Sequence, residues 1–272
     1  MQAERRRHAS VDAVFEMVDR DGEVGGGIIA GALAYRFFIW LLPLALVAVA
    51  GLGLAADSAS ESPEEAAESL GVGGLISSSI ANAANSSNRW YALLVGIPVL
   101  LWLTRSVLRA LIAAHRLVWA DVRAAAPKAT ALATVRLLGL LLALLVLSGL
   151  ASTVRAWSPG IGVISTLLVA LPSAGVWLLV SLRLPHRGAP WTALIPGALL
   201  FGLGTELLQI VTAYFIAPYA ISKQGTYGAL GLAAALLLGL FLLCRLMVSA
   251  AELNATLWDR RTRQNRPTLG VG

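Results

Sequence analysis

Several side chains that carry a charge or an amide lie inside long apolar segments of this chain, and six of them are candidates for a common site. The six are Arg36, Arg105, Glu206, Gln209, Arg245 and Glu252. Such groups are costly in hydrocarbon, so in a membrane protein they are expected to face other protein groups or a water-filled cavity. An arginine can also hold a phosphate or a carboxylate through two parallel hydrogen bonds. The six residues therefore predict a polar pocket for the anionic head of a substrate.

The depth of these groups follows from their place in each apolar segment, at about 1.5 Å per residue of helix. Three cations fall in the inner half of the membrane: Arg36, Arg105 and Arg245. Glu206 and Gln209 lie nearer the middle of their segment, one turn apart on one face, and Glu252 lies close to an inner end. In a simpler interpretation, each long side chain reaches the inner headgroups or pairs with a neighbouring charge. The sequence leaves both interpretations open.

No arrangement of residues in the sequence is typical of an enzyme. The three histidines, His8, His115 and His186, are far apart, and no run of histidines and carboxylates has the spacing of a metal-dependent nuclease. The serines at 77–79 lack the Gly-x-Ser-x-Gly turn of a serine hydrolase. The sequence also lacks the interleaved aromatic and basic residues that bind single-stranded nucleic acids. We therefore expect no catalytic residue, metal or cofactor, and no nucleic-acid partner.

The elements that must position the six polar groups are long apolar segments. Of the 272 residues, 57% are hydrophobic and 13% are charged, and the mean hydropathy is +0.75. A helix needs roughly 20 apolar residues to cross about 30 Å of hydrocarbon. Six segments have about that length, at 28–55, 90–112, 131–156, 161–184, 191–217 and 227–253. The sequence therefore predicts an all-α fold, a polytopic membrane bundle of six transmembrane helices.

The N-terminal segment is expected to contain an amphipathic helix. Its apolar residues at positions 11, 14, 15 and 18 follow the helical period, and Asp12, Glu16 and Asp19 are turned away from them. We expect this helix, over 10–19, to lie at the membrane surface.

The longest polar segment is the outer loop between the first two spans, at 57–89. Its first half is acidic, and the sequence Ser-Pro-Glu-Glu at 62–65 has the form of a helix-capping box. Two short helices are expected here. A helical cap over the outer face of the bundle and a mobile loop both agree with this pattern.

Lysine and arginine residues are concentrated before the first span, in every second connection and after the sixth span, which is the pattern of cytoplasmic segments. This bias places both termini in the cytoplasm, as an even number of spans also requires. The predicted division is a cytoplasmic N-terminal segment at 1–27, a transmembrane domain at 28–257 and a basic cytoplasmic tail at 258–272.

Small residues and prolines within the apolar segments indicate how the helices pack and bend. Gly231, Ala235 and Gly239 recur at every fourth position, which would form a strip for close packing of another helix, although ordinary helix-forming residues produce the same pattern. Prolines lie inside or at the ends of the segments, at 43, 98, 172, 196 and 218. A proline removes one backbone hydrogen bond and bends a helix, which leaves room for a cavity.

Three stretches of the chain carry motifs of one protein family. Residues 31–44, GALAYRFFIWLLPL, place a proline eight residues after an Ala-Tyr pair. The other stretches are WTALIPGA at 191–198, and Tyr-Gly at 227–228 together with AELNA at 251–255. They resemble the YihY/virulence factor BrkB family of bacterial inner-membrane proteins. The positions that carry the resemblance are Ala34, Tyr35, Pro43, Pro196, Gly197, Tyr227, Gly228, Glu252 and Asn254.

This resemblance implies six spans, a place in the bacterial inner membrane and a role in the cell envelope. Ala250 stands where the family usually has glycine, and Arg36 and Arg245 are not part of the family's pattern. Members have been labelled serum-resistance factors, ribonucleases and transporters, so the resemblance alone does not decide the activity.

The residues favour a transporter or flippase that moves an anionic amphiphile, such as a lipid precursor, across the bacterial cytoplasmic membrane. A basic inner half would attract a phosphate or carboxylate head, and apolar walls would suit its tail. Membrane lipids and this substrate are therefore the expected partners. A non-transporting envelope scaffold or resistance factor is the alternative. An intramembrane enzyme is a third class, for which the spacing pairs no nucleophile with a base.

Overall fold

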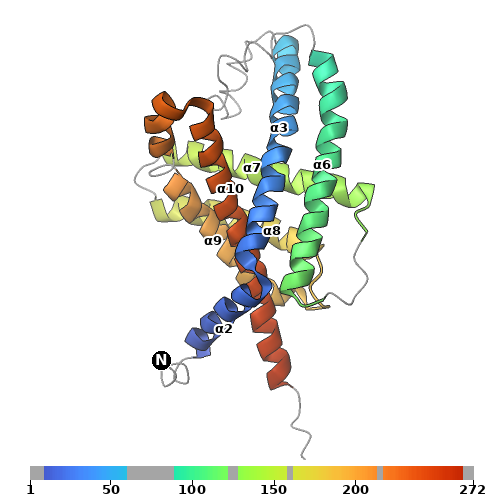
Figure 1. Cartoon of the computed structure of the whole chain (residues 1–272), viewed down its shortest axis with the longest axis vertical. Coiled ribbons are helices and arrows are strands. Elements are labelled where there is room, and N and C mark those ends of the chain that lie inside the picture. The colour runs from blue at the N-terminus through green and yellow to red at the C-terminus, as the bar shows by residue number, and fades with distance from the viewer. Residues whose placement is uncertain (1–8, 60–88, 122–127, 158–161, 213–216, 266–272) are drawn as a thin grey trace, which may run out of the picture. The chain divides into compact units, whose positions relative to one another are not determined.

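The computed structural model describes residues 9–59, 89–121, 128–157, 162–212 and 217–265, and these residues are helical with no β-strand among them (Figure 1). They form seven α-helices and one short 3-10 helix. The helices are α2 (Ala9–Val24), α3 (Gly26–Ala59), α6 (Arg89–Val118), α7 (Ala131–Trp157), α8 (Gly162–Ser181), η2 (Trp191–Ala193), α9 (Ile195–Val211) and α10 (Ala217–Gln264). The predicted all-α fold is confirmed.

Four of these helices contain a stretch long and apolar enough to cross a membrane. The stretches are Gly26–Gly51, Trp90–Val118, Ala131–Gly149 and Ala233–Gln264, which correspond to the predicted first, second, third and sixth spans. Val169–Ser181 of α8 and Ile195–Val211 of α9 are apolar but shorter. The 17 residues of α9 rise only about 25 Å. The bundle of six spans therefore stays a prediction, as does the orientation of its termini.

The contacts divide the chain into two compact units. The first unit consists of Met1–Ala34, Ala110–Lys128 and Ala170–Gly272, and the second of Tyr35–Arg109 and Ala129–Val169.

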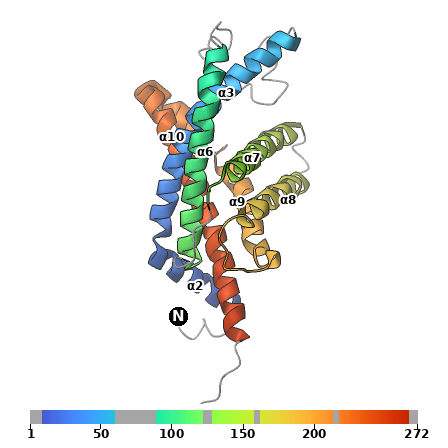
Figure 2. The ribbon, with the colours of Figure 1, turned by 90° about the vertical axis from the view of Figure 1, so that its right-hand side faces the viewer.

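In the second unit, α3 and α6 lie side by side in both views (Figures 1 and 2). The indole nitrogen of Trp40 on α3 donates a hydrogen bond of 2.9 Å to the hydroxyl of Thr104 on α6, and both residues are buried. This buried polar contact fixes the two helices against each other.

In the first unit, α9 packs tightly against α8 and α10 because three of its positions are glycine. A β-carbon at Gly197 would lie 2.2 Å from the carbonyl oxygen of Ala250, and one at Gly202 would lie 2.3 Å from that of Ala170. A β-carbon at Gly204 would meet the side chain of Leu246 at 2.5 Å. A side chain at Gly197 or Gly202 would have to move a backbone, so these two glycines set the distance between the helices, whereas at Gly204 the side chain of Leu246 would have to move.

The strip of small residues predicted on the last span does not mark such a contact. A β-carbon added at Gly239 would meet no atom of the described residues within 4 Å. The prediction of close helix packing at Gly239 is therefore wrong for the part of the chain that the structure describes. Alanine and glycine at every fourth position reflect the local composition of α10 here, and the tight contacts lie about two and three turns further on, at Leu246 and Ala250.

The short helix α2 precedes the first predicted span and lies along the C-terminal part of α10 (Figure 1). Gly25 separates it from α3 and has a φ of +69°, a conformation that glycine adopts without steric cost. Val14 and Val18 are exposed, whereas Asp12 and Glu16 face α10. The polar face of α2 is therefore the docking face, and Val14 and Val18 on its apolar face stay exposed; the place of this helix at the membrane surface stays a prediction.

The outer loop, the end of the last span and the prolines complete the comparison with the prediction. The two short helices expected in the outer loop fall within 60–88 and lie outside the described residues. The helix α10 runs on to Gln264, about three turns beyond the predicted end of the sixth span, so the first part of the basic tail is helical. Pro43, Pro98 and Pro172 lie inside α3, α6 and α8, as expected, and Pro196 lies in the first turn of α9.

Candidate functional site

A cluster of charged side chains gathers where α2, the first turn of α3 and α10 meet in the first unit. On α10, Arg245, Ser249 and Glu252 follow a spacing of four and three residues, which places them on one face. The Nη2 atom of Arg245 donates a hydrogen bond of 2.7 Å to Asp21 Oδ2 of α2. Its Nη1 atom lies 3.4 Å from Ser249 Oγ and 3.8 Å from Glu252 Oε2. One guanidinium therefore lies between two carboxylates, which we call the inner carboxylate pair.

Gly26 allows the two carboxylates of this pair to approach each other. Asp21 Oδ1 and Glu252 Oε1 lie 1.9 and 2.8 Å from the position that a β-carbon of Gly26 would occupy. The side chain of Glu252 is 0% exposed. Neither oxygen of Glu252 nor Oδ1 of Asp21 has a hydrogen-bond partner among the described residues. Two carboxylates thus share one guanidinium, and three buried oxygen atoms lack a donor.

A ladder of ion pairs continues from this cluster along α2 and α10. Arg20 pairs with Asp259 and also donates a hydrogen bond of 2.9 Å to the carbonyl oxygen of Val118. Asp259 also accepts a hydrogen bond of 3.3 Å from Arg187, in the connection that follows α8. These contacts tie four parts of the first unit together: α2, α10, the end of α6 and the connection that follows α8.

At the N-terminal end of α2, Asp12 and Glu16 pair with Arg260, and Glu16 also pairs with Arg263. Burial alone would raise the pKa of Glu16. The hydrogen bonds and charges of Arg263 and Arg260 outweigh it, so the pKa of Glu16 lies below its usual value. The carboxylate of Glu16 is therefore held in its charged form, and ion pairs attach α2 to the end of α10.

Asn254 connects α10 with the beginning of α9. Its Oδ1 atom accepts a hydrogen bond of 2.7 Å from the backbone nitrogen of Gly197, and its Nδ2 atom donates one of 3.2 Å to the carbonyl oxygen of Leu194. The first backbone N–H groups of a helix have no partner within the helix, so a side chain from another helix can satisfy one of them. Asn254 is buried and acts here as a positioning residue for α9.

The two polar residues predicted on α9 are also in the first unit. Glu206 is buried in the core, and Gln209 is half-buried one turn later. Their predicted spacing on one face agrees with the helix over Ile195–Val211. Beside this part of α9, the rings of Trp177 and Phe201 stack at a centroid distance of 4.5 Å.

The two arginines predicted on the first and second spans are in the second unit. Arg36 on α3 is exposed, and its Nη1 atom donates a hydrogen bond to Ser106 Oγ on α6. Arg105 precedes Ser106 and is exposed as well. Arg36 and Arg105 therefore belong to one unit and Glu206 belongs to the other. A single pocket lined by all three stays a prediction.

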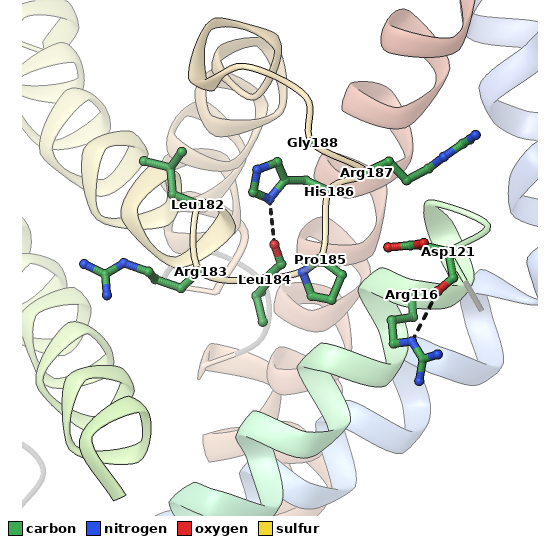
Figure 3. A pocket seen from close by; sticks show the side chains of 9 residues that line it. All are labelled: Arg116, Asp121, Leu182, Arg183, Leu184, Pro185, His186, Arg187 and Gly188. Atoms are coloured by element: carbon green, nitrogen blue, oxygen red, sulfur yellow. Dashed lines mark hydrogen bonds between the residues drawn. The ribbon is translucent and has the colours of Figure 1, made fainter. Parts of the chain in front are cut away.

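A surface cavity of about 330 Å³ lies in the connection between α8 and η2, beside the end of α6 (Figure 3). It is lined by Arg116, Asp121, Leu182, Arg183, Leu184, Pro185, His186, Arg187 and Gly188. Figure 3 shows that the guanidinium groups of Arg116, Arg183 and Arg187 point in different directions. The sequence analysis used these arginines only as an indication of the cytoplasmic side. Their side chains do not converge on one point, so the cavity is a basic surface rather than a built anion site.

No group of three or more metal-ligating side chains gathers among the residues that the structure describes. The inner carboxylate pair is therefore the most distinctive chemical feature of the described residues. The sequence singled out Arg245 and Glu252 of this cluster but not Asp21. Asp21 is 224 positions from Arg245 in the chain, so no local pattern could have joined them.

The sequence pattern of the virulence factor BrkB family matches residues 19–269, which is nearly the whole chain. The chain belongs to the virulence factor BrkB family. The resemblance drawn from the motifs is thereby confirmed, and with it the general description of a helical, apolar membrane protein. No curated protein and no solved structure matches the chain.

The BrkB motif residues gather at two places in the described structure. Gly197 and Asn254 make the contact between α9 and α10, Pro196 lies beside Gly197 in the first turn of α9, and Glu252 belongs to the inner carboxylate pair. Ala34 is buried and Tyr35 is exposed on α3. Tyr227 and Gly228 lie in α10, in a part whose side chains are outside the described residues. Two of the nine motif positions, Gly197 and Asn254, thus hold α9 to α10.

Proposed function

We propose that this BrkB-family protein binds anionic amphiphiles, such as a lipid precursor, and moves them across the bacterial cytoplasmic membrane. The observation that carries the proposal is the exposed position of Arg36 inside an apolar helix. Arg36 lies about 15 Å along α3 from Gly26, within a stretch that is long enough to span a membrane. A guanidinium at that depth needs an anionic partner or water, because hydrocarbon solvates it poorly.

The surroundings of Arg36 support an anionic headgroup as this partner. Its hydrogen bond to Ser106 uses one nitrogen atom of the guanidinium and holds the side chain against α6. Arg105, the neighbour of Ser106, adds a second exposed cation on the same pair of helices. A phosphate or carboxylate can accept two parallel hydrogen bonds from the remaining N–H groups of an arginine. The apolar side chains around these cations suit the acyl part of an amphiphile.

Prolines give both helices a point at which they can bend. Pro43 lies seven residues after Arg36 on α3, and Pro98 lies seven residues before Arg105 on α6. Because the two helices run in opposite directions, both prolines lie on the same side of the arginines, about two turns away. A bend at these positions would move the arginines relative to the rest of each helix. Such motion is what a transporter needs to carry a headgroup across the membrane.

The test is a lipid-translocation assay on protein reconstituted in vesicles, with fluorescent phosphatidylglycerol compared with fluorescent phosphatidylcholine. We expect the wild type to move the anionic lipid faster. Arg36→Lys and Arg105→Lys should each reduce this movement about tenfold, since a lost charge-assisted hydrogen bond costs about 1.5 kcal/mol or more. Arg136→Lys on α7, another exposed arginine in an apolar helix, is the matched control and should move lipid at the wild-type rate.

Two results would replace the transporter with the non-transporting envelope scaffold. The first is a wild type that shows no preference for the anionic lipid, and the second is a pair of lysine variants with wild-type rates. Glu206, buried on α9, is the residue that we expect to make transport depend on pH. Glu206→Gln should therefore flatten the pH profile of the translocation rate.

A further inference from the structure

The inner carboxylate pair carries more negative charge than its surroundings neutralise. Asp21 and Glu252 would bring two negative charges to the site, and Arg245 brings one positive charge. The other cation close by is Arg20, which is committed to Asp259 and to the carbonyl oxygen of Val118. An ionised carboxylate that is buried without hydrogen-bond donors costs several kcal/mol. The site therefore has room for one more unit of positive charge.

The geometry of the oxygen atoms indicates what kind of cation fits. Asp21 Oδ1 and Glu252 Oε1 meet over Gly26, and both are buried without a hydrogen-bond partner among the described residues. Calcium and magnesium ions require about six oxygen ligands. The described side chains offer only these two carboxylates, with the guanidinium of Arg245 beside them. A proton needs only two facing oxygen atoms, and two carboxylates that share a site do not both ionise readily.

We propose that Asp21 and Glu252 form a proton-binding site, in which one proton is held in a hydrogen bond between Asp21 Oδ1 and Glu252 Oε1. Arg245 neutralises the charge that remains. With the proton bound, the charges of the two carboxyl groups and of the guanidinium sum to zero. The buried oxygen atoms Asp21 Oδ1 and Glu252 Oε1 then also gain a hydrogen-bond partner. The proposal concerns proton binding alone and does not depend on lipid transport.

Release of this proton has a structural consequence. Asp21 lies on α2 and Glu252 on α10, so two ionised carboxylates would repel each other across the contact between these helices. Gly26 follows directly at the beginning of α3, and a β-carbon there would collide with both carboxylates. Protonation of the inner carboxylate pair is thus coupled to the position of the segment in which α2 ends and α3 begins.

Infrared spectroscopy of the purified full-length protein tests the proposal, because a carboxylic acid and a carboxylate absorb at different frequencies. We expect the wild type to keep a carboxylic-acid band at neutral pH. The band should be lost in Glu252→Gln, which removes one of the two acids. It should also be lost in Asp21→Asn, because Glu252 can then ionise against Arg245 alone. Glu23→Gln, at an exposed position two residues after Asp21, is the control and should keep the band.

Thermal unfolding of each variant establishes that it is folded before its spectrum is compared. Asp21 is only half-buried, so Asp21→Asn provides the comparison if Glu252→Gln fails to fold. A wild type without a carboxylic-acid band at neutral pH would overturn the proposal. A band that persists in a folded Glu252→Gln or Asp21→Asn protein would also overturn it, because the proton would then belong to another group.

Discussion

Gly197 shows how strongly one residue can determine the packing of two helices. Its missing β-carbon leaves space for the carbonyl oxygen of Ala250 and for the amide of Asn254, which then satisfies the backbone of α9. In the sequence, Gly197 and Asn254 stand out only as motif positions. Their physical role is a close approach of two backbones together with a cap, and it depends on residues 57 positions apart.

We expect Gly197→Ala to destabilise the protein by about 1 to 3 kcal/mol, because the new methyl group would overlap a backbone oxygen that cannot move alone. Gly239→Ala on α10 is the control. There the added β-carbon meets open space within the described residues, and alanine favours a helix by about 1 kcal/mol over glycine. Thermal unfolding in detergent measures both variants. Equal melting temperatures for the two would show that the contact between α9 and α10 is looser than described.

Arg245 illustrates why a charged residue in an apolar segment is hard to interpret from sequence. The two interpretations were a substrate pocket and a simple pairing with a neighbouring charge. The structure pairs Arg245 with Asp21 and places it 3.8 Å from Glu252. Arg245 is therefore paired within the described residues, and the pocket stays a prediction for Arg245 as it does for Arg36, Arg105 and Glu206.

Among the helices, α2 has the surroundings that differ most from those its sequence pattern predicts. Its amphipathic pattern predicts a helix at the membrane surface, and the exposure of Val14 and Val18, at 58% and 59%, leaves their side chains available to lipid. The sequence did not indicate that the opposite face would bind another helix. Asp12 and Glu16 find their partners, Arg260 and Arg263, at the other end of the chain.

The contact between α2 and α10 should weaken in acid. The pKa of Glu16 is lower in the folded protein than in the unfolded chain, so its contribution to stability is complete above the unfolded value and is lost as pH falls through the folded value. Hydrogen exchange of the amides in Ala9–Val24 should therefore be faster in acid, after correction for the intrinsic exchange rate. Glu16→Gln should produce faster exchange already at neutral pH, by about 1 kcal/mol of local stability.

Asp19→Asn is the matched control for this experiment, since Asp19 is exposed on the same helix. Its exchange rates should equal those of the wild type at neutral pH. If Glu16→Gln also exchanges at the wild-type rate, the ion pairs with Arg260 and Arg263 do not hold α2 in place, and apolar contacts must do so.

At the scale of the whole molecule, the number of spans and their direction are the main open predictions. Four helices are long and apolar enough to cross a membrane, and α8 and α9 have shorter apolar stretches. The bias of lysine and arginine still predicts six spans with both termini in the cytoplasm. A short helix such as α9 can span if the flanking residues reach the headgroups, at a modest cost in free energy.

Cysteine labelling tests this topology in intact cells. Cys244 is buried and is the single cysteine, so Cys244→Ala provides a background without reactive thiols. Ser60→Cys in the predicted outer loop should react with an impermeant thiol reagent, and Ser10→Cys should react only after the cells are opened. Labelling at position 10 but not at position 60 would reverse the orientation, and labelling at both would show that the segment 28–55 does not cross the membrane.

The sequence by itself determined the properties that depend on neighbouring residues. Apolar runs of helical length identify a membrane protein with an all-α fold, and short motifs such as those around Pro43 and Pro196 identify the BrkB family. These features are local because a helix satisfies its own backbone hydrogen bonds, so its length and hydrophobicity can be read without knowing its neighbours.

Only the tertiary structure decided which polar groups meet. Asp21 and Arg245 are 224 positions apart, and Asp12 and Arg260 are 248 apart. Whether such charges pair depends on the packing of helices, and that packing is set by glycines whose close contacts no periodic pattern reveals. Gly239 belonged to a pattern and makes no close contact among the described residues, whereas Gly197, Gly202 and Gly204 follow no regular spacing and hold the helices together. The chemistry of the inner carboxylate pair therefore became visible only when α2 was placed against α10.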